Sequence, residues 1–132
     1  PEEMKKWGLP EEGARFVPDP VTEAGSTYQV GYEGYDDSGD LFRATVRSLE
    51  AAGAQPTCLD SEVTEISGEV SARSFFAQYT DGGISRVRVG WSSEDNGGYV
   101  SLELPSESGA EDYERAVRNN QCRPIVVIDP AE

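Results

Sequence analysis

Acidic side chains dominate the residues that could do chemistry in this sequence. The 132-residue chain has 25 Asp and Glu, 11 Lys and Arg and no His, so its formal net charge at pH 7 is -14. Without His it cannot build a Ser-His-Asp or Cys-His catalytic set, and it lacks the commonest metal ligand. So acidic a surface repels the nucleic-acid backbone and the anionic leaflet of a membrane. The charge therefore excludes unassisted nucleic-acid binding and leaves carboxylates and cysteines to be considered.

The two cysteines, Cys58 and Cys122, lie far apart and outside any Cys-x-x-Cys spacing. A metal site would need more Cys or some His. The favoured interpretation is one structural disulfide, which implies an exported protein, and the alternative is two buried free thiols in a cytosolic protein. If the disulfide forms, it closes a loop of about 65 residues and contributes about 4 kcal/mol in the chain-entropy model.

The acidic turn YDDSGD is the first candidate site. Asp36, Asp37 and Asp40 resemble the start of a calcium loop, but the later positions of an EF-hand are occupied here by Leu and Arg. An irregular calcium site completed by Glu94 and Asp95 stays open. The favoured interpretation is that these acids cap the helix that follows. We expect no metal and no cofactor.

The tyrosines of YQVGYEGY are the second candidate. Tyr28 and Tyr32 are expected to line the core face of a strand, whereas Tyr35, beside the acidic turn, is expected at the surface. Tyr is enriched in interface cores, so this region can bind a partner. The predicted binding surface comprises Tyr35, Asp36, Asp37, Asp40, Glu94 and Asp95.

Two further sets of charged residues have a favoured structural interpretation. Arg86 and Arg88 share one outward sheet face and could bind an anionic group, but pairing with Glu103 and other cross-strand acids is favoured. Carboxylate catalysis needs two acids at a fixed separation, one of them with a raised pKa, and the sequence shows neither. Solvated surface charge is the default interpretation, and no catalytic residue is predicted.

The hydrophobic pattern divides the chain into a leader and one domain. Residues 1–25 are rich in Pro and Glu and read as a loose leader or tether, and residues 26–132 read as a single α+β domain. Alternating and helical periods predict a strand at 26–33, a helix at 39–52, a four-strand meander within 62–105, a helix at 106–120 and a final doubly buried strand at 123–129. The predicted fold is a mostly meandering antiparallel sheet with both helices packed on one face, in the order β-α-β-β-β-β-α-β.

Turn and cap residues predict how these elements join. Asn96-Gly97 suits a two-residue hairpin turn that places Trp91 opposite Leu102. The alternation of apolar residues in the preceding hairpin favours a three-residue loop at 81–83.

The two predicted helices each have candidate N-caps in the sequence. Asp37, Ser38 or Asp40 can cap the first helix, and Ser108 with Glu111 forms a capping box for the second.

These observations support three hypotheses about function. The first is a non-enzymatic binding domain of an exported or cell-surface, lipoprotein-type bacterial protein, tethered to the membrane through its N-terminal side. A cytoplasmic location is the alternative. The second is an acidic inhibitor or immunity-type protein that neutralises a basic partner. The third is a carboxylate-based hydrolase. The bacterial source is an inference from nine Arg against two Lys, and no transmembrane segment is predicted.

Overall fold

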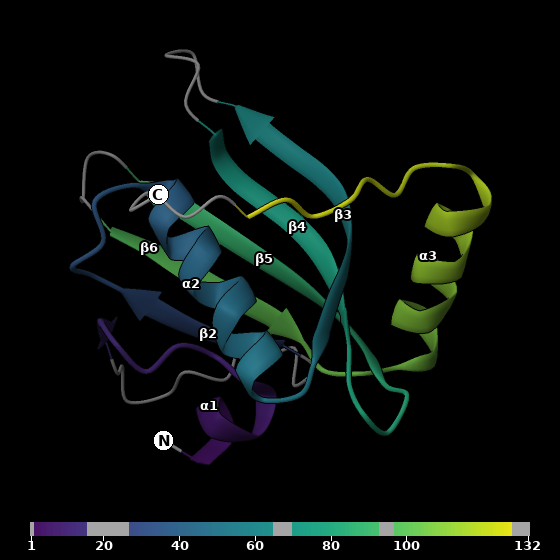
Figure 1. The fold of residues 1–132 in the computed structure, drawn as a ribbon, viewed down its shortest axis with the longest axis horizontal. Coiled ribbons are helices and arrows are strands. Elements are labelled where there is room, and N and C mark those ends of the chain that lie inside the picture. The colour runs from purple at the N-terminus through teal and green to yellow at the C-terminus, as the bar shows by residue number, and fades with distance from the viewer. Residues whose placement is uncertain (1, 16–26, 65–69, 93–96, 128–132) are drawn as a thin grey trace.

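A computed structural model describes residues 2–15, 27–64, 70–92 and 97–127 and confirms the α+β fold (Figure 1). All strands join one antiparallel sheet in the order β1-β2-β6-β5-β4-β3. Between β2 and α3 the element order is β-α-β-β-β-β-α, as predicted. The elements are α1 (Glu2–Trp7), β1 (Ala14–Arg15), β2 (Thr27–Tyr32), α2 (Ser38–Ala51), β3 (Gln55–Thr64), β4 (Val70–Gln78), β5 (Ile84–Ser92), β6 (Gly97–Glu103) and α3 (Glu107–Arg118).

Helix α2 lies across one face of the sheet (Figure 1). The Asp37 side chain accepts a hydrogen bond from the backbone N–H of Asp40 and so satisfies one of the free donors of the first turn. The apolar stripe of α2 is buried against a layer of sheet residues that includes Phe75 and Val87. The buried positions of the helix are Leu41, Phe42, Thr45, Val46 and Leu49.

The two long helices cover opposite faces of the sheet, so the prediction that both pack on one face is wrong. Adjacent residues of β4 explain the difference, because Phe75 and Phe76 point to opposite faces and both are fully buried. Phe75 contacts Phe42 of α2 edge to face, and Phe76 contacts Tyr113 of α3 in the same way. The apolar surface around Phe76, on the face opposite α2, is buried by α3.

The pairing registers of the hairpins differ from the predicted ones, but the apolar side chains lie on the same face of the sheet as predicted. Trp91 lies opposite Gly98 rather than Leu102, a shift of four residues that keeps the same side chains on the α2 face. The predicted Asn96-Gly97 turn is wrong at Gly97, which pairs with Ser92 inside the sheet, and residues 93–96 lie outside the described part. Because the pleat repeats every two residues, an even shift leaves the core unchanged.

The loop between β4 and β5 has the predicted three residues but lies one residue earlier, at 80–82. The Tyr79 backbone N–H donates to the Gly83 carbonyl, and the Gly82 N–H donates to the Tyr79 carbonyl. Gly82 has a φ of 91°, the left-handed conformation that this turn requires and that glycine adopts without strain.

The C-terminal part of the fold departs most from prediction. Helix α3 is capped by Ser106, whose hydroxyl accepts from the Gly109 N–H, so the predicted Ser108 capping box is wrong. The final strand is reduced to one bridge between Arg123 and Leu59. Residues 124–127 form no strand, and Val126 is 71% exposed, so burial on both faces is wrong there.

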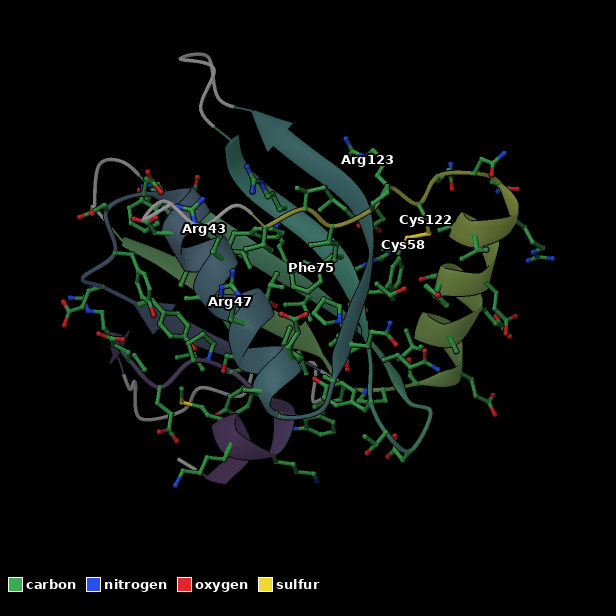
Figure 2. The ribbon with its side chains drawn as sticks, in the orientation of Figure 1. Arg43, Arg47, Cys58, Phe75, Cys122 and Arg123 are labelled. Carbon is green, nitrogen blue, oxygen red and sulfur yellow. A yellow bond between two sulfur atoms is a disulfide. The ribbon has the colours of Figure 1, made fainter. Side chains whose placement is uncertain are left out.

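The Cys58–Cys122 disulfide forms as predicted (Figure 2). Strand β3 begins at Gln55, earlier than the predicted 62, and this start brings Cys58 into the sheet. Cys122 follows α3, so the bond fixes the point where the chain passes around the β3 edge from the α3 face to the α2 face. Among the described residues no helix is long and apolar enough to cross a membrane.

Candidate functional site

An acidic hollow collects three of the six predicted binding residues. It is an open depression of about 800 Å³ where the turn before α2 meets the N-terminal segment. Tyr35, Asp36 and Asp40 were expected from the sequence, and the other lining residues were not. We use the name acidic hollow for the depression lined by Glu12, Gly13, Glu33, Gly34, Tyr35, Asp36 and Asp40.

Three tyrosine hydroxyls attach the N-terminal segment to the domain, and the Tyr35 hydroxyl does so at the acidic hollow. Tyr32 donates to the Pro10 carbonyl (2.7 Å), Tyr35 to the Glu12 carbonyl (2.8 Å) and Tyr79 to the Trp7 carbonyl (2.9 Å). Residues 2–15, expected as part of a loose leader, are therefore packed on the domain, with Met4 and Leu9 in the core. The predicted boundary at residue 25 falls among residues outside the described part.

The close approach of two backbone segments explains why residue 13 is a glycine. A Cβ on Gly13 would collide with the backbone oxygen of Glu33, and Gly13 has a φ of 78°. Glycine is therefore the residue that lets β1 pair with the end of β2, where the Glu33 N–H donates to the Gly13 carbonyl. This pairing places the Glu12 side chain at the rim of the acidic hollow.

Two of the four carboxylates in the acidic hollow are neutralised and two are not. Glu33 pairs with Arg15 at 3.4 Å, and Asp40 pairs with Arg43 one turn along α2. Among the described residues, Glu12 and Asp36 have no cationic partner, and both are exposed. Burial, followed by the negative charge of Glu12, raises the pKa of Tyr35. The hollow therefore keeps an uncompensated negative charge beside a tyrosine ring.

The other predicted binding residues have different positions. Asp37 caps α2, as the favoured interpretation held. Glu94 and Asp95 lie outside the described part of the chain. Within the residues that the structure describes, no group of three or more His, Cys, Asp or Glu side chains is placed to hold a metal ion.

Alkaline pH is expected to weaken the tyrosine anchors. Burial raises the pKa of Tyr79 to about 12 and also raises the pKa of Tyr32, because the loss of water around the phenol disfavours the charged phenolate. Above about pH 10 the unfolded chain gives up these protons while the folded chain keeps them, so the free energy of unfolding falls as the pH rises toward about 12. Denaturant unfolding at about pH 9, 10 and 11 measures this fall.

A Tyr79→Phe variant is the control for the alkaline effect. Because it removes one raised pKa, its free energy of unfolding should decline less between about pH 10 and about 12 than that of the parent protein. Tyrosinate absorbance gives an independent readout in the folded state. If all six tyrosines titrated together near pH 10, the anchors would not be buried as described.

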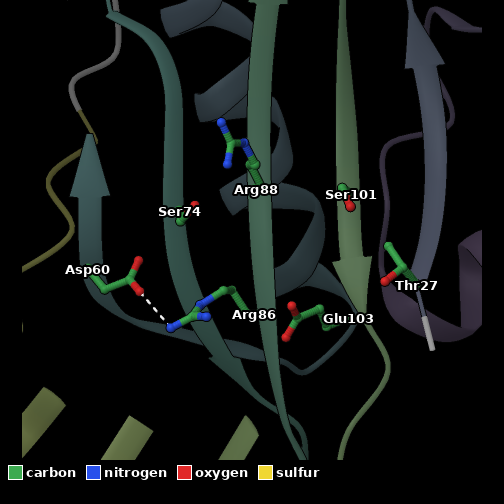
Figure 3. A pocket seen from close by; sticks show the side chains of 7 residues that line it. All are labelled: Thr27, Asp60, Ser74, Arg86, Arg88, Ser101 and Glu103. Atoms are coloured by element: carbon green, nitrogen blue, oxygen red, sulfur yellow. Dashed lines mark hydrogen bonds and ion pairs between the residues drawn. The ribbon is translucent and has the colours of Figure 1, made fainter. Parts of the chain in front are cut away.

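A second depression, on the opposite sheet face, is lined by arginines. Two adjoining pockets of about 350 and 590 Å³ share Asp60 and Arg86, and we call them together the arginine groove. Its sheet side, drawn in Figure 3, is lined by Thr27, Asp60, Ser74, Arg86, Arg88, Ser101 and Glu103. Its other side, at α3 and the segment after it, is lined by Asp112, Arg115, Ala116, Gln121 and Arg123.

Strand register and a β-bulge build the arginine groove. Ser74, Arg88 and Ser101 are direct cross-strand neighbours on β4, β5 and β6. On β3, Leu59 pairs with Phe75 and Ser61 pairs with Ser74, so Asp60 is the extra residue of a bulge. Bulges redirect a side chain and are common beside functional sites. This bulge places the Asp60 carboxylate 2.9 Å from an Nη atom of Arg86.

The sequence identified only part of the arginine groove. Arg86 and Arg88 were noted as a pair that could bind an anion, with pairing to acids favoured. The predicted pairing with Glu103 is wrong among the described residues. Arg86 pairs with Asp60 and, at 3.9 Å, with Asp112 of α3. The contributions of Asp60 and Asp112 were missed because a bulge and the packing of α3 leave no signal in the local pattern.

Comparisons of the chain with protein-family models, with curated proteins and with solved structures find no match.

Proposed function

We propose that this chain is a non-enzymatic binding domain of an exported bacterial protein, and that it binds a positively charged protein partner at the acidic hollow. The observation that carries the proposal is the pair of uncompensated carboxylates, Glu12 and Asp36, beside the Tyr35 ring. A lysine or arginine side chain of a partner can pair with these carboxylates, while the tyrosine ring offers an apolar contact.

The compartment follows from the disulfide. Disulfides form and persist in oxidising environments outside the cytoplasm, and Cys58 and Cys122 form one. We infer in addition that the protein is secreted or held at the cell surface in the manner of a lipoprotein. Because residues 2–15 pack on the domain, a tether on the N-terminal side would leave it near α1.

The overall charge supports a basic partner. A net charge of -14 raises the rate of association with a cationic protein, and this effect weakens with added salt. A narrower form of the proposal is an acidic inhibitor or immunity-type protein whose basic partner is an enzyme. The charge supports that form equally, and inhibition of a basic enzyme by the purified domain would distinguish it.

The surroundings of the carboxylates favour binding over hydrolysis. A general acid needs an apolar environment that keeps its proton at neutral pH. In the acidic hollow, Glu12, Glu33 and Asp36 are exposed to water, and Glu33 and Asp40 are paired with arginines. This arrangement supports charge recognition and offers no protected proton donor.

Neutralising the two unpaired carboxylates tests the proposed function. In a Glu12→Gln/Asp36→Asn variant we expect the affinity for a nine-residue polyarginine peptide at low salt to fall roughly five- to thirtyfold, because two surface ion pairs are lost. Isothermal titration calorimetry or fluorescence anisotropy measures the affinity. Raising the salt to about 0.5 M should abolish most of the binding to the parent protein.

A matched variant separates site binding from general charge. Glu111→Gln/Glu114→Gln removes two exposed acids from α3 and changes the net charge by the same amount. Its affinity for the peptide should stay within about twofold of the parent. Equal losses in the two variants, or binding that ignores salt, would refute a site at the acidic hollow.

A further inference from the structure

The arginine groove gathers positive charge on an otherwise acidic protein. Four of the nine arginines line it, namely Arg86, Arg88, Arg115 and Arg123. They face three acids, Asp60, Glu103 and Asp112, in a chain whose net charge is -14. Positive charge concentrated in one concave place on an acidic protein favours an anionic ligand at that place.

Arg86 is held in place at the centre of the arginine groove. One Nη donates to Asp60 at 2.9 Å, and the guanidinium lies 4.9 Å from the centre of the Phe76 ring. These contacts fix the group before a ligand arrives, which lowers the entropic cost of binding. Its side chain is still 33% exposed, so part of it remains open to the groove.

Arg88 supplies a second guanidinium that is free to bind. It lies between Ser74 and Ser101 on the sheet and is exposed (Figure 3). No acid pairs with Arg88 among the residues that the structure describes. A guanidinium can bind a carboxylate or a phosphate through two parallel hydrogen bonds.

We infer that the arginine groove is a binding site for a small polar ligand that carries a carboxylate or phosphate group, with Arg88 as the main contact and Arg86 as the fixed second donor. The hydroxyls of Ser74 and Ser101 beside Arg88 suit the polar remainder of such a ligand, and an apolar ligand would leave them unsatisfied. The two adjoining pockets are of the size that proteins use for small molecules. This site lies on the sheet face opposite α2, and it does not depend on the acidic hollow.

Nuclear magnetic resonance of the whole chain tests the inference with inorganic phosphate and with acetate as probes. At constant ionic strength we expect saturable shifts of the Arg86 and Arg88 Nε–H signals with at least one probe, and the comparison of the two shows whether phosphate or carboxylate is preferred. Arg88→Gln should weaken the binding at least about tenfold, because a charge-assisted pair is lost. Glu103→Gln should strengthen it, because it removes a negative charge from the same pocket.

The matched control is Arg118→Gln, which removes an exposed arginine that does not line the arginine groove. It should bind both probes within about twofold of the parent protein. The inference is overturned if neither probe gives saturable shifts, or if Arg88→Gln and Arg118→Gln weaken binding equally. All three variants change exposed side chains, and their amide spectra show whether each remains folded.

Discussion

Removal of the Cys58–Cys122 disulfide is expected to lower the free energy of unfolding by about 3 to 5 kcal/mol. The two cysteines are 64 residues apart, and a loop of this length loses a large amount of conformational freedom in the unfolded chain when it is closed. For a domain of this size, a loss of that order is a large fraction of the total stability. The disulfide is therefore expected to supply a large share of the stability of the fold.

The position of the disulfide predicts which part of the fold is destabilised first when the bond is removed. Cys58 is buried with Phe76, Ile84 and Ala116 in the small core between the sheet and α3. Beyond Cys122, two backbone hydrogen bonds join Leu59 and Arg123 at the β3 edge. Without the covalent bond, α3 is held against the sheet by this small core, the two hydrogen bonds and the polar contacts of Asp112 and Tyr113. We expect α3 to detach before the core beneath α2 unfolds.

Urea unfolding of a Cys58→Ala/Cys122→Ala variant, compared with the oxidised and reduced parent protein, measures the effect. Hydrogen exchange should show lost protection in α3 while β5 and β6 keep theirs. The variant and the reduced parent should agree, because both lack the same cross-link. An unfolding midpoint equal to that of the oxidised protein would show that the disulfide does not stabilise the fold.

Patterns with a fixed period explain the part of the fold that could be predicted. The apolar stripe of α2 and the alternation along β5 and β6 place side chains on a face whatever the register. The four-residue error opposite Trp91 therefore left the core face intact. Asp37 was predictable as an N-cap, because capping depends on residues within one turn.

Features that depend on packing between distant segments could not be predicted. Helix α3 packs on the face of the sheet that carries Phe76, because that side chain would otherwise leave apolar surface exposed. Which side chains share this face is known only once the strands are paired in the sheet. The bulge at Asp60 is a local departure from pairing that the alternation does not encode. Glu12 reaches the acidic hollow through contacts between distant segments, namely the Glu33–Gly13 pairing and the Tyr35 hydrogen bond to its carbonyl across 23 residues of sequence.

Truncation of Phe75 should strongly destabilise the larger core. Its side chain, labelled in Figure 2, is fully buried. Its ring meets that of Phe42 edge to face, with 5.6 Å between the ring centres. Phe75→Ala removes these contacts and leaves a cavity between α2 and the sheet, so we expect a loss of about 3 to 5 kcal/mol. Phe75→Leu keeps most of the volume and should cost about 1 to 2 kcal/mol, which keeps the effect measurable if the alanine variant does not fold.

The neighbouring residue provides the matched comparison for this prediction. Phe76 is equally buried but faces α3, where its ring lies 5.3 Å from that of Tyr113. Phe76→Leu should reduce the hydrogen-exchange protection of α3 more than that of α2, and Phe75→Leu should do the reverse. The covalent link at Cys58 limits how far α3 can move, so the Phe76 variant should unfold at a higher denaturant concentration than the Phe75 variant. Equal loss of protection in both helices for both variants would show that the two faces unfold as one unit, contrary to this expectation.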